Sequence, residues 1–120
     1  MSWNFSGDRP IYAQLVERLR LRIVTGEYPP GERLPSVREL AEQAGVNPNT
    51  MQRAMAELER TGIVFSQRTS GRFVTEDAER IAALRGELAL EKLRLFLTEM
   101  RSLGYSRGAV LALLEKEEST

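Results

Sequence analysis

The sequence of 120 residues contains no cysteine and no histidine. The lack of cysteine excludes disulfides and thiolate metal sites, and makes a reducing cytoplasm the natural compartment. The lack of histidine removes the commonest general base and the commonest metal ligand. No apolar run is long enough to span a bilayer, and the N-terminus has no signal-peptide pattern. We therefore expect a cytoplasmic protein that is not an enzyme, holds no cofactor or metal and has no membrane partner.

Charge is balanced overall but unevenly distributed. The 17 basic side chains match 17 acidic ones, and a net charge of zero argues mildly against a nucleic-acid partner. Residues 1–75 carry ten basic and eight acidic side chains, whereas residues 76–120 carry seven and nine. Both lysines, Lys92 and Lys116, lie in the second part. Every cation of the first part is therefore an arginine, which is suited to bidentate contact with phosphate and guanine.

Residues 34–58 predict two short helices joined by a glycine-containing turn. Ser36 and Glu39 form a capping box in front of the first helix. Asn47 is placed to cap the second helix, with a proline in its first position. Two helices joined by a turn of three or four residues are typical of a helix-turn-helix.

Another helix is predicted before this pair. It starts near Arg9-Pro10, with Asp8 as its cap. A single apolar stripe runs along it at helical spacing, formed by Ile11, Leu15, Leu19 and Ile23. The segment Tyr28 to Gly31, with two prolines, predicts a turn.

Two short β-prone segments, 63–65 and 72–74, follow the helix-turn-helix and flank the polar stretch 67–71. This pattern predicts a β-hairpin, and its tip would be the wing of a winged helix-turn-helix. The fold class expected is thus mainly α with a small β-hairpin. We place a winged helix-turn-helix domain at residues 1–75 and a two-helix dimerisation region at residues 76–120.

The second region is predicted to be helical from Asp77 to about Leu103, with Gly86 as a weak point, and to end in a helix capped by Ser106. One monomer cannot easily bury its apolar face, so we expect that face to pack against a second copy. The side chains predicted to form this interface are Leu84, Leu88, Leu93, Phe96, Leu97 and Met100. The alternative is that the region folds back on its own winged domain. Trp3 and Phe5 could pack against either this region or the first helix.

The second helix of the helix-turn-helix has two distinct faces. At 100° per residue, Met51, Ala54, Met55 and Leu58 cluster on the core side. The opposite side carries side chains that can read base edges, because amides pair with adenine and arginine with guanine. These candidate DNA contacts are Asn49, Thr50, Gln52 and Arg53, with Asn47 at the helix start. The alternative is a solvated face on which Asn47 and Thr50 are only caps.

Further candidate contacts lie outside that helix. Arg38 occupies the first turn of the preceding helix, where a cation is poorly placed for the helix dipole, so an external phosphate would be a natural partner. The wing could contact phosphate or enter the minor groove through Arg68, Thr69, Ser70, Gly71 and Arg72. The alternatives are that Arg38 is a plain surface arginine and that the hairpin tip is polar only because it is exposed to solvent.

Five stretches of the chain resemble the GntR family of bacterial transcription regulators, and the short tail resembles the YtrA-type branch. The five stretches are Pro10 to Leu15, Gly26 to Gly31, Leu34 to Ala41, Val46 to Ala54 and Gly71 to Val74. The resemblance implies a winged-helix homodimer on a pseudo-palindromic operator, with Arg38, the start of the second helix and the wing glycine on DNA. Many relatives have arginine where this chain has Pro48 and Gln52, so we assign the arginine role to Arg53.

The function expected is that of a dimeric DNA-binding regulator, a repressor that binds a two-fold operator. The branch resemblance implies control of a transporter operon. A small-molecule effector is left open, because 45 tail residues are too few to enclose a large ligand. One alternative is a winged-helix protein-interaction module without DNA binding. Another alternative is an enzyme fragment, since some relatives fuse this winged domain to a large aminotransferase-like domain. The polar end of the chain argues against that alternative.

Overall fold

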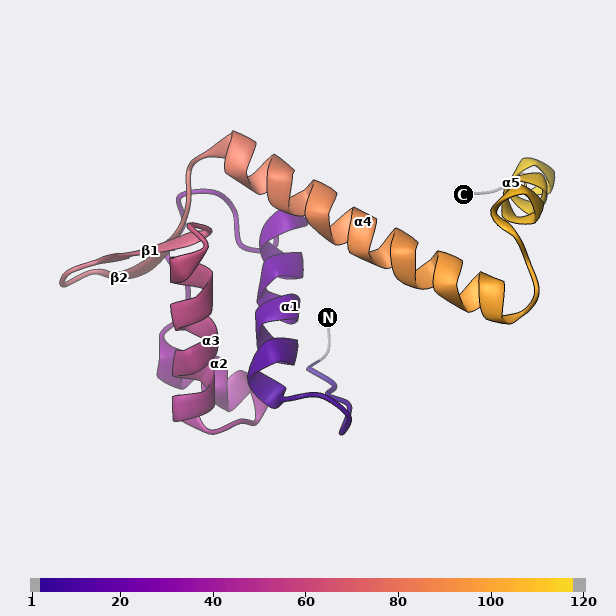
Figure 1. Ribbon diagram of the computed structural model, residues 1–120. Coiled ribbons are helices and arrows are strands. Elements are labelled where there is room, and N and C mark those ends of the chain that lie inside the picture. The colour runs from indigo at the N-terminus through magenta and orange to yellow at the C-terminus, as the bar shows by residue number, and fades with distance from the viewer. Residues whose placement is uncertain (1–2, 118–120) are drawn as a thin grey trace. The chain divides into compact units, whose positions relative to one another are not determined.

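The computed structural model describes residues 3–117, and it is mainly helical with one antiparallel hairpin (Figure 1). The elements in chain order are α1 (Ile11–Val24), α2 (Val37–Ala44), α3 (Pro48–Arg60), β1 (Val64–Gln67), β2 (Gly71–Val74), α4 (Ala78–Ser102) and α5 (Arg107–Lys116). The fold class predicted from the sequence is thereby confirmed.

The chain divides into two compact units, which we call the winged unit (residues 3–85) and the tail unit (residues 86–117). The division lies beyond the expected boundary between residues 75 and 76. Ile81 and Leu84, in the first turns of α4, are buried and belong to the winged unit. Burial of these two side chains therefore extends the winged unit into α4.

The core of the winged unit lies where α1 and α2 pack on α3. Met51, Ala54, Met55 and Leu58 are all fully buried, which confirms the core face predicted for α3. Their removal from water is the main favourable contribution to folding. The same packing orients α3 so that its polar side faces outward.

Local capping fixes the positions of α2 and α3. The Ser36 hydroxyl accepts a hydrogen bond from the Glu39 amide at 3.1 Å, and the Glu39 carboxylate accepts one from the Ser36 amide at 2.9 Å. The Asn47 side chain accepts from the Asn49 amide at 2.7 Å. Both predicted caps are confirmed, and they satisfy amides that the first helical turn leaves free.

The start of α1 differs from the prediction. Pro10 is the N-cap residue, and no side chain caps the helix. Asp8 instead accepts a hydrogen bond from the Ser6 hydroxyl, and that bond is the largest cause of a lowered pKa at the Asp8 carboxyl. The prediction of Asp8 as the cap was wrong because the N-cap position is Pro10, two residues later in the chain.

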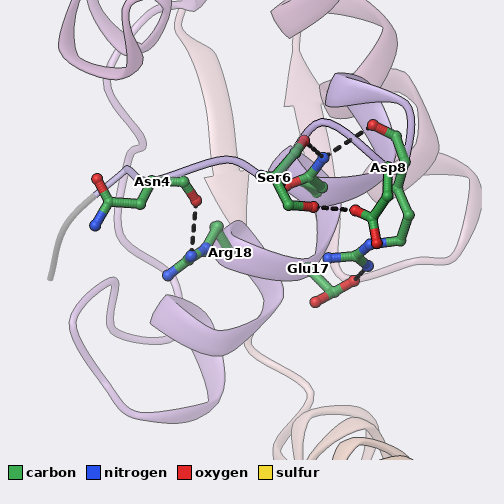
Figure 2. A network of polar contacts seen from close by, with 7 residues as sticks. Asn4, Ser6, Asp8, Glu17 and Arg18 are labelled. Atoms are coloured by element: carbon green, nitrogen blue, oxygen red, sulfur yellow. Dashed lines mark hydrogen bonds and ion pairs between the residues drawn. The ribbon is translucent and has the colours of Figure 1, made fainter.

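The segment before α1 is tied to that helix by polar contacts (Figure 2). The buried Gln14 side chain accepts from the Ser6 amide at 2.8 Å and donates to the Ser6 and Arg9 carbonyls at 2.9 Å. Arg18 donates to the Asn4 carbonyl at 2.8 Å. These contacts hold the N-terminal segment along the first two turns of α1.

Trp3 packs against α1, which decides between the two locations left open by the sequence. The Arg22 guanidinium lies 4.0 Å from the centroid of the Trp3 ring, and the Phe5 ring lies 6.5 Å from it. A cation over an indole face is attracted by the ring quadrupole. The aromatic pair thus belongs to the winged unit.

The hairpin pairs Val64 with Val74 and Gln67 with Gly71, and it projects away from the three helices of the winged unit (Figure 1). Residues 31–34 also pair with β2, where the Leu34 amide donates to the Arg72 carbonyl at 2.8 Å. The sequence predicted the turn but not this pairing. The base of the wing is therefore held by chain segments on both sides of the helix-turn-helix.

The tail unit contains the later turns of α4, a turn at residues 103–106, and α5. The Ser106 hydroxyl accepts from the Ala109 amide at 3.2 Å, which confirms the predicted cap of α5. α4 runs through Gly86 without interruption. In the described part of the chain, no helix is both long enough and apolar enough to cross a membrane.

Candidate nucleic-acid interface

The outward face of α3 carries the predicted base-reading side chains. Asn49, Gln52 and Arg53 are exposed, and Thr50 is half-buried. Asn47 is exposed at the N-cap, where its side chain is already engaged by the Asn49 amide. The polar and apolar sides of this helix therefore separate as predicted.

Two hollows flank this face. The first, which we call the α1-side hollow, has a volume of about 360 Å³. Its lining residues are Pro10, Ile11, Tyr12, Asn49, Thr50 and Arg53. Within it the Arg53 guanidinium stacks on the Tyr12 ring, 3.6 Å from the ring centroid. Three of the predicted contact residues thus meet the start of α1.

The second hollow, the wing-side hollow, has a volume of about 370 Å³. Its lining residues are Arg33, Leu34, Pro35, Ser36, Val37, Arg38, Gln52, Gly71 and Arg72. It brings three arginines together with Gln52 of α3 and the glycine of the wing. An arrangement of arginines around a recess beside a recognition helix is suited to a phosphate group.

Gly71 is required by its backbone and by its neighbour. Its φ is +103°, a conformation that favours glycine. A Cβ at this position would lie 3.0 Å from Nε of Arg33. A residue with a Cβ would strain the backbone here and press on the Arg33 side chain.

Arg72 is held by an acidic partner. Its guanidinium forms an ion pair with Glu59 of α3, and Glu59 also accepts from the Ser66 hydroxyl at 2.9 Å. The Arg72 hydrogen bond is the largest cause of the lowered pKa of the Glu59 carboxyl. Arg72 was predicted as a DNA contact, and here its guanidinium is engaged in fixing the wing to α3.

Arg38 and Arg68 differ from Arg72. Both are exposed, and within residues 3–117 neither has a recorded hydrogen bond or ion pair. Thr69 and Ser70 lie beside Arg68 in the turn between the strands, and both are exposed. Arg68, Thr69 and Ser70 line neither hollow, so the wing tip is a separate part of the predicted surface.

The apolar residues predicted for the dimer interface divide into three groups by exposure. Leu93 is 50% exposed and Phe96 is 41% exposed. Leu88, Leu97 and Met100 are half-buried. Leu84 is only 1% exposed in the single chain and belongs to the winged unit, and its role in a dimer interface stays a prediction. The helical periodicity placed Leu84 on the stripe, but its side chain is already covered within one chain.

Acidic side chains of the tail do not assemble into a metal site. Over residues 3–117, no group of three or more potential ligands is close enough to hold an ion. This region includes Glu87, Glu91 and Glu99, which the sequence spaces along one helix.

Two residues of this surface were not singled out from the sequence. Tyr12 stands in the α1-side hollow and Arg33 in the wing-side hollow. Tyr12 lies in the first turn of α1, far in sequence from α3. Arg33 lies between the turn predicted at Tyr28 to Gly31 and the capping box, where no element was predicted. The bridge between Arg33 and Phe73 had no signal in the local pattern.

Comparison with known proteins now adds the family. Residues 11–74 match the bacterial regulatory proteins of the gntR family. The chain is 42% identical over 111 residues to the HTH-type transcriptional regulator YhcF of Bacillus subtilis, covering 92% of each protein. It is 43% identical over 70 residues to the HTH-type transcriptional repressor YtrA of the same organism, covering 58% of this chain and 54% of YtrA. This chain thus spans about half the length of YtrA.

Solved structures give the same result. A GntR family transcriptional regulator from Listeria monocytogenes superposes with a TM-score of 0.85 at 43% identity, covering 95% of this chain and all of the other. The DNA-binding domain of AraR in complex with operator ORX1 superposes with a TM-score of 0.56 at 31% identity, covering 60% of this chain and 93% of that domain. The chain belongs to the gntR family of bacterial regulatory proteins, which are transcriptional regulators that bind DNA.

Proposed function

We propose that this chain is a sequence-specific transcriptional repressor that binds a pseudo-palindromic operator as a homodimer. The observation that carries the proposal is the outward face of α3, where Asn49, Gln52 and Arg53 are exposed between two hollows. The major groove of B-DNA admits an α-helix and presents a distinct donor and acceptor pattern for each base pair.

Base reading is assigned to the side chains at the middle of that face. Asn49 and Gln52 carry amides that pair with adenine, and Arg53 carries a guanidinium that pairs with guanine. Gln52 lines the wing-side hollow, whereas Asn49 and Arg53 line the α1-side hollow. The helix would therefore read bases along both of its flanks.

Contacts to the phosphate backbone are assigned to the residues around α3. Arg38 lines the wing-side hollow, and Arg68 extends from the wing turn with Thr69 and Ser70 beside it. Phosphate contacts fix the register of a protein on the duplex without reading sequence. Arg72 would act indirectly, since Glu59 already engages its guanidinium and that pair orients the wing.

The homodimer is assigned to the tail unit. Large apolar side chains that are exposed in one chain are concentrated there, with Leu93 and Phe96 among them. Exposed apolar patches of this kind mark protein interaction sites. A second copy would also supply the second recognition helix, because one short helix reads too few base pairs for specificity in a genome.

The names of relatives support repression as the direction of regulation. YtrA is named a repressor. MngR of Escherichia coli (strain K12), 35% identical over 71 residues and matched over 30% of its length, is named a mannosyl-D-glycerate transport/metabolism system repressor. These names support repression, and the resemblance to the YtrA-type branch supports a transporter operon as the regulated target. An operator on a bacterial chromosome would place this chain in the cytoplasm.

A gel-shift titration with the DNA upstream of the gene tests the proposal. The wild-type chain should bind that DNA more tightly than a scrambled duplex of equal length, and binding should weaken steeply with salt. Arg53→Ala should lose about 1–3 kcal/mol of discrimination at the base pair it reads. Arg38→Ala should weaken binding to all duplexes and make the salt dependence shallower.

Two outcomes would count against the proposal. Equal affinity for the upstream and the scrambled duplex would remove sequence-specific recognition. Association with a protein partner that does not depend on salt, together with no affinity for DNA, would instead identify a protein-interaction module. Arg101→Ala, in the later turns of α4, is the matched control, since Arg101 is an exposed arginine outside both hollows.

A further inference from the structure

The contact between α1 and α3 includes a cation–π interaction between Tyr12 of α1 and Arg53 of α3. The Cζ atom of Arg53 lies 3.6 Å from the centroid of the Tyr12 ring. Tyr12 is half-buried in the first turn of α1, and Arg53 is exposed on the outward face of α3. Because α1 packs along α3, the ring is fixed to the same framework as the helix that carries the arginine.

Stacking and base reading use different parts of a guanidinium. The cation–π attraction acts through the flat face of the group. The hydrogen bonds to O6 and N7 of guanine are donated by N–H groups that lie in its plane and point along its edge. A guanidinium whose face lies on Tyr12 can therefore still present its edge to a base.

In the described part of the chain, the stack on Tyr12 is the contact that restrains the Arg53 guanidinium. Within residues 3–117, Arg53 has no recorded hydrogen bond or ion pair. A free arginine side chain has many rotamers, and binding in one of them costs conformational entropy. A ring that already holds the group would reduce that cost when Arg53 meets its base.

We propose that Tyr12 is a positioning residue for base recognition: its ring holds the Arg53 guanidinium against α1 so that its edge faces the base pair that Arg53 reads. This inference rests on the proposed operator binding. It makes Tyr12 a determinant of sequence specificity although Tyr12 itself lies on α1 and outside the helix-turn-helix.

The first test compares ring-free and ring-bearing variants of the full-length chain. Affinity is measured by fluorescence anisotropy on the bound upstream duplex and on duplexes with single base-pair changes. Tyr12→Leu should reduce discrimination about fivefold to tenfold at the base pair where Arg53→Ala reduces it, within the range of one bidentate contact. Tyr12→Phe keeps the ring and should retain the discrimination. Tyr12→Met is a second ring-free variant and should match Tyr12→Leu.

A second measurement reports on the stack without DNA. In NMR spectra of the free protein, the ring current should shift the Hδ protons of Arg53 upfield in the wild type and in Tyr12→Phe. The shift should vanish in Tyr12→Leu, while the remaining spectrum shows that the variant is folded. The double variant Tyr12→Leu/Arg53→Ala should discriminate no less than Arg53→Ala alone, since Tyr12 acts through Arg53.

Several results would overturn the inference. A uniform loss of affinity for every duplex in Tyr12→Leu would make Tyr12 a structural or phosphate-contacting residue. The same loss in Tyr12→Phe would assign the effect to the hydroxyl. Discrimination lost in Arg53→Ala but kept in both ring-free variants would also reject it. Failure of the wild type to prefer any upstream duplex is a different result, and it would reject the proposed function instead.

Discussion

The winged unit and the tail unit differ in the exposure of their large apolar side chains: most are buried in the first and most are exposed in the second. In the winged unit, the residues on the inner faces of the helices are buried, and Leu19 and Leu58 are both 0% exposed. In the tail unit, Val110 is buried and Leu88, Leu97 and Met100 are half-buried. Most of its large apolar residues are exposed, and these are Leu90, Leu93, Leu95, Phe96, Leu103, Tyr105, Leu111, Leu113 and Leu114. Both units carry helices with apolar residues, so the difference lies in whether one chain supplies the surface that covers them.

This difference separates two tasks. The winged unit forms its own core from three helices and a hairpin, as a layered domain requires. The tail unit exposes apolar surface that a second copy could cover, which is the basis of the proposed homodimer. Substitutions in the two units should therefore affect different measurable quantities.

The largest expected effect comes from the core of the winged unit. Leu58→Ala should lower the free energy of unfolding by about 2–5 kcal/mol, because it leaves a cavity in the packed interior. The measurement is urea unfolding followed by the fluorescence of Trp3, which is the single tryptophan of the chain. Leu95→Ala, at a leucine that is 61% exposed, is the control and should change stability by less than about 0.5 kcal/mol. Equal losses in the two variants would break the comparison.

The next effect concerns association through the tail. The double variant Leu93→Glu/Phe96→Glu should weaken self-association at least tenfold, or about 1.4 kcal/mol, because charges would be placed in an apolar interface. Sedimentation equilibrium measures the monomer–dimer constant, and the Trp3 signal should show an intact winged unit. Leu95→Glu is the matched control, since residues two apart on a helix point to nearly opposite sides. An unchanged dimer in the double variant would place the interface elsewhere.

Helix caps give a smaller and more local comparison. Ser36→Ala removes the cap of α2 and should lower the stability of the winged unit by about 1 kcal/mol. Ser106→Ala removes the cap of α5 and should speed amide exchange in α5 while the Trp3 unfolding curve stays unchanged. The same midpoint shift in both variants would mean that the two units unfold as one.

The smallest expected effect is on the stability of the winged unit in acid, through the ion pair between Arg72 of the wing and Glu59 of α3. The Arg72 guanidinium holds the pKa of Glu59 below its usual range. A lowered pKa stabilises the fold above the unfolded value, near pH 4.3, and that contribution is lost as pH falls through the folded pKa. Glu59→Gln should therefore cost about 1 kcal/mol or less at neutral pH and flatten the loss of stability below about pH 5. Glu42→Gln, an exposed carboxylate on α2, is the control. If the free energy of unfolding of Glu59→Gln fell with acid as steeply as that of the wild type, the Glu59–Arg72 ion pair would make no contribution to the stability of the winged unit.

Local features of the fold were predictable because their causes lie within a few residues. The capping residues Ser36, Asn47 and Ser106 each bond an amide two or three positions further on. Asp8 was misassigned by the same reasoning, because the N-cap position lies at Pro10 and the Asp8 carboxylate accepts from the Ser6 hydroxyl instead. The burial of Leu84 within the winged unit was not predictable, because a periodic stripe shows which side of a helix is apolar and not what covers it.

The sequence by itself determined where the helices lie and how α3 is phased, because capping and a 3.6-residue period are local properties. It also determined the residue types on the outward face of α3. Tertiary structure alone decided that Glu59 engages Arg72, that Gly71 accommodates Arg33 and that Tyr12 stacks on Arg53. These pairs are far apart in sequence, and they meet only because α1, α3 and the base of the wing pack on one core.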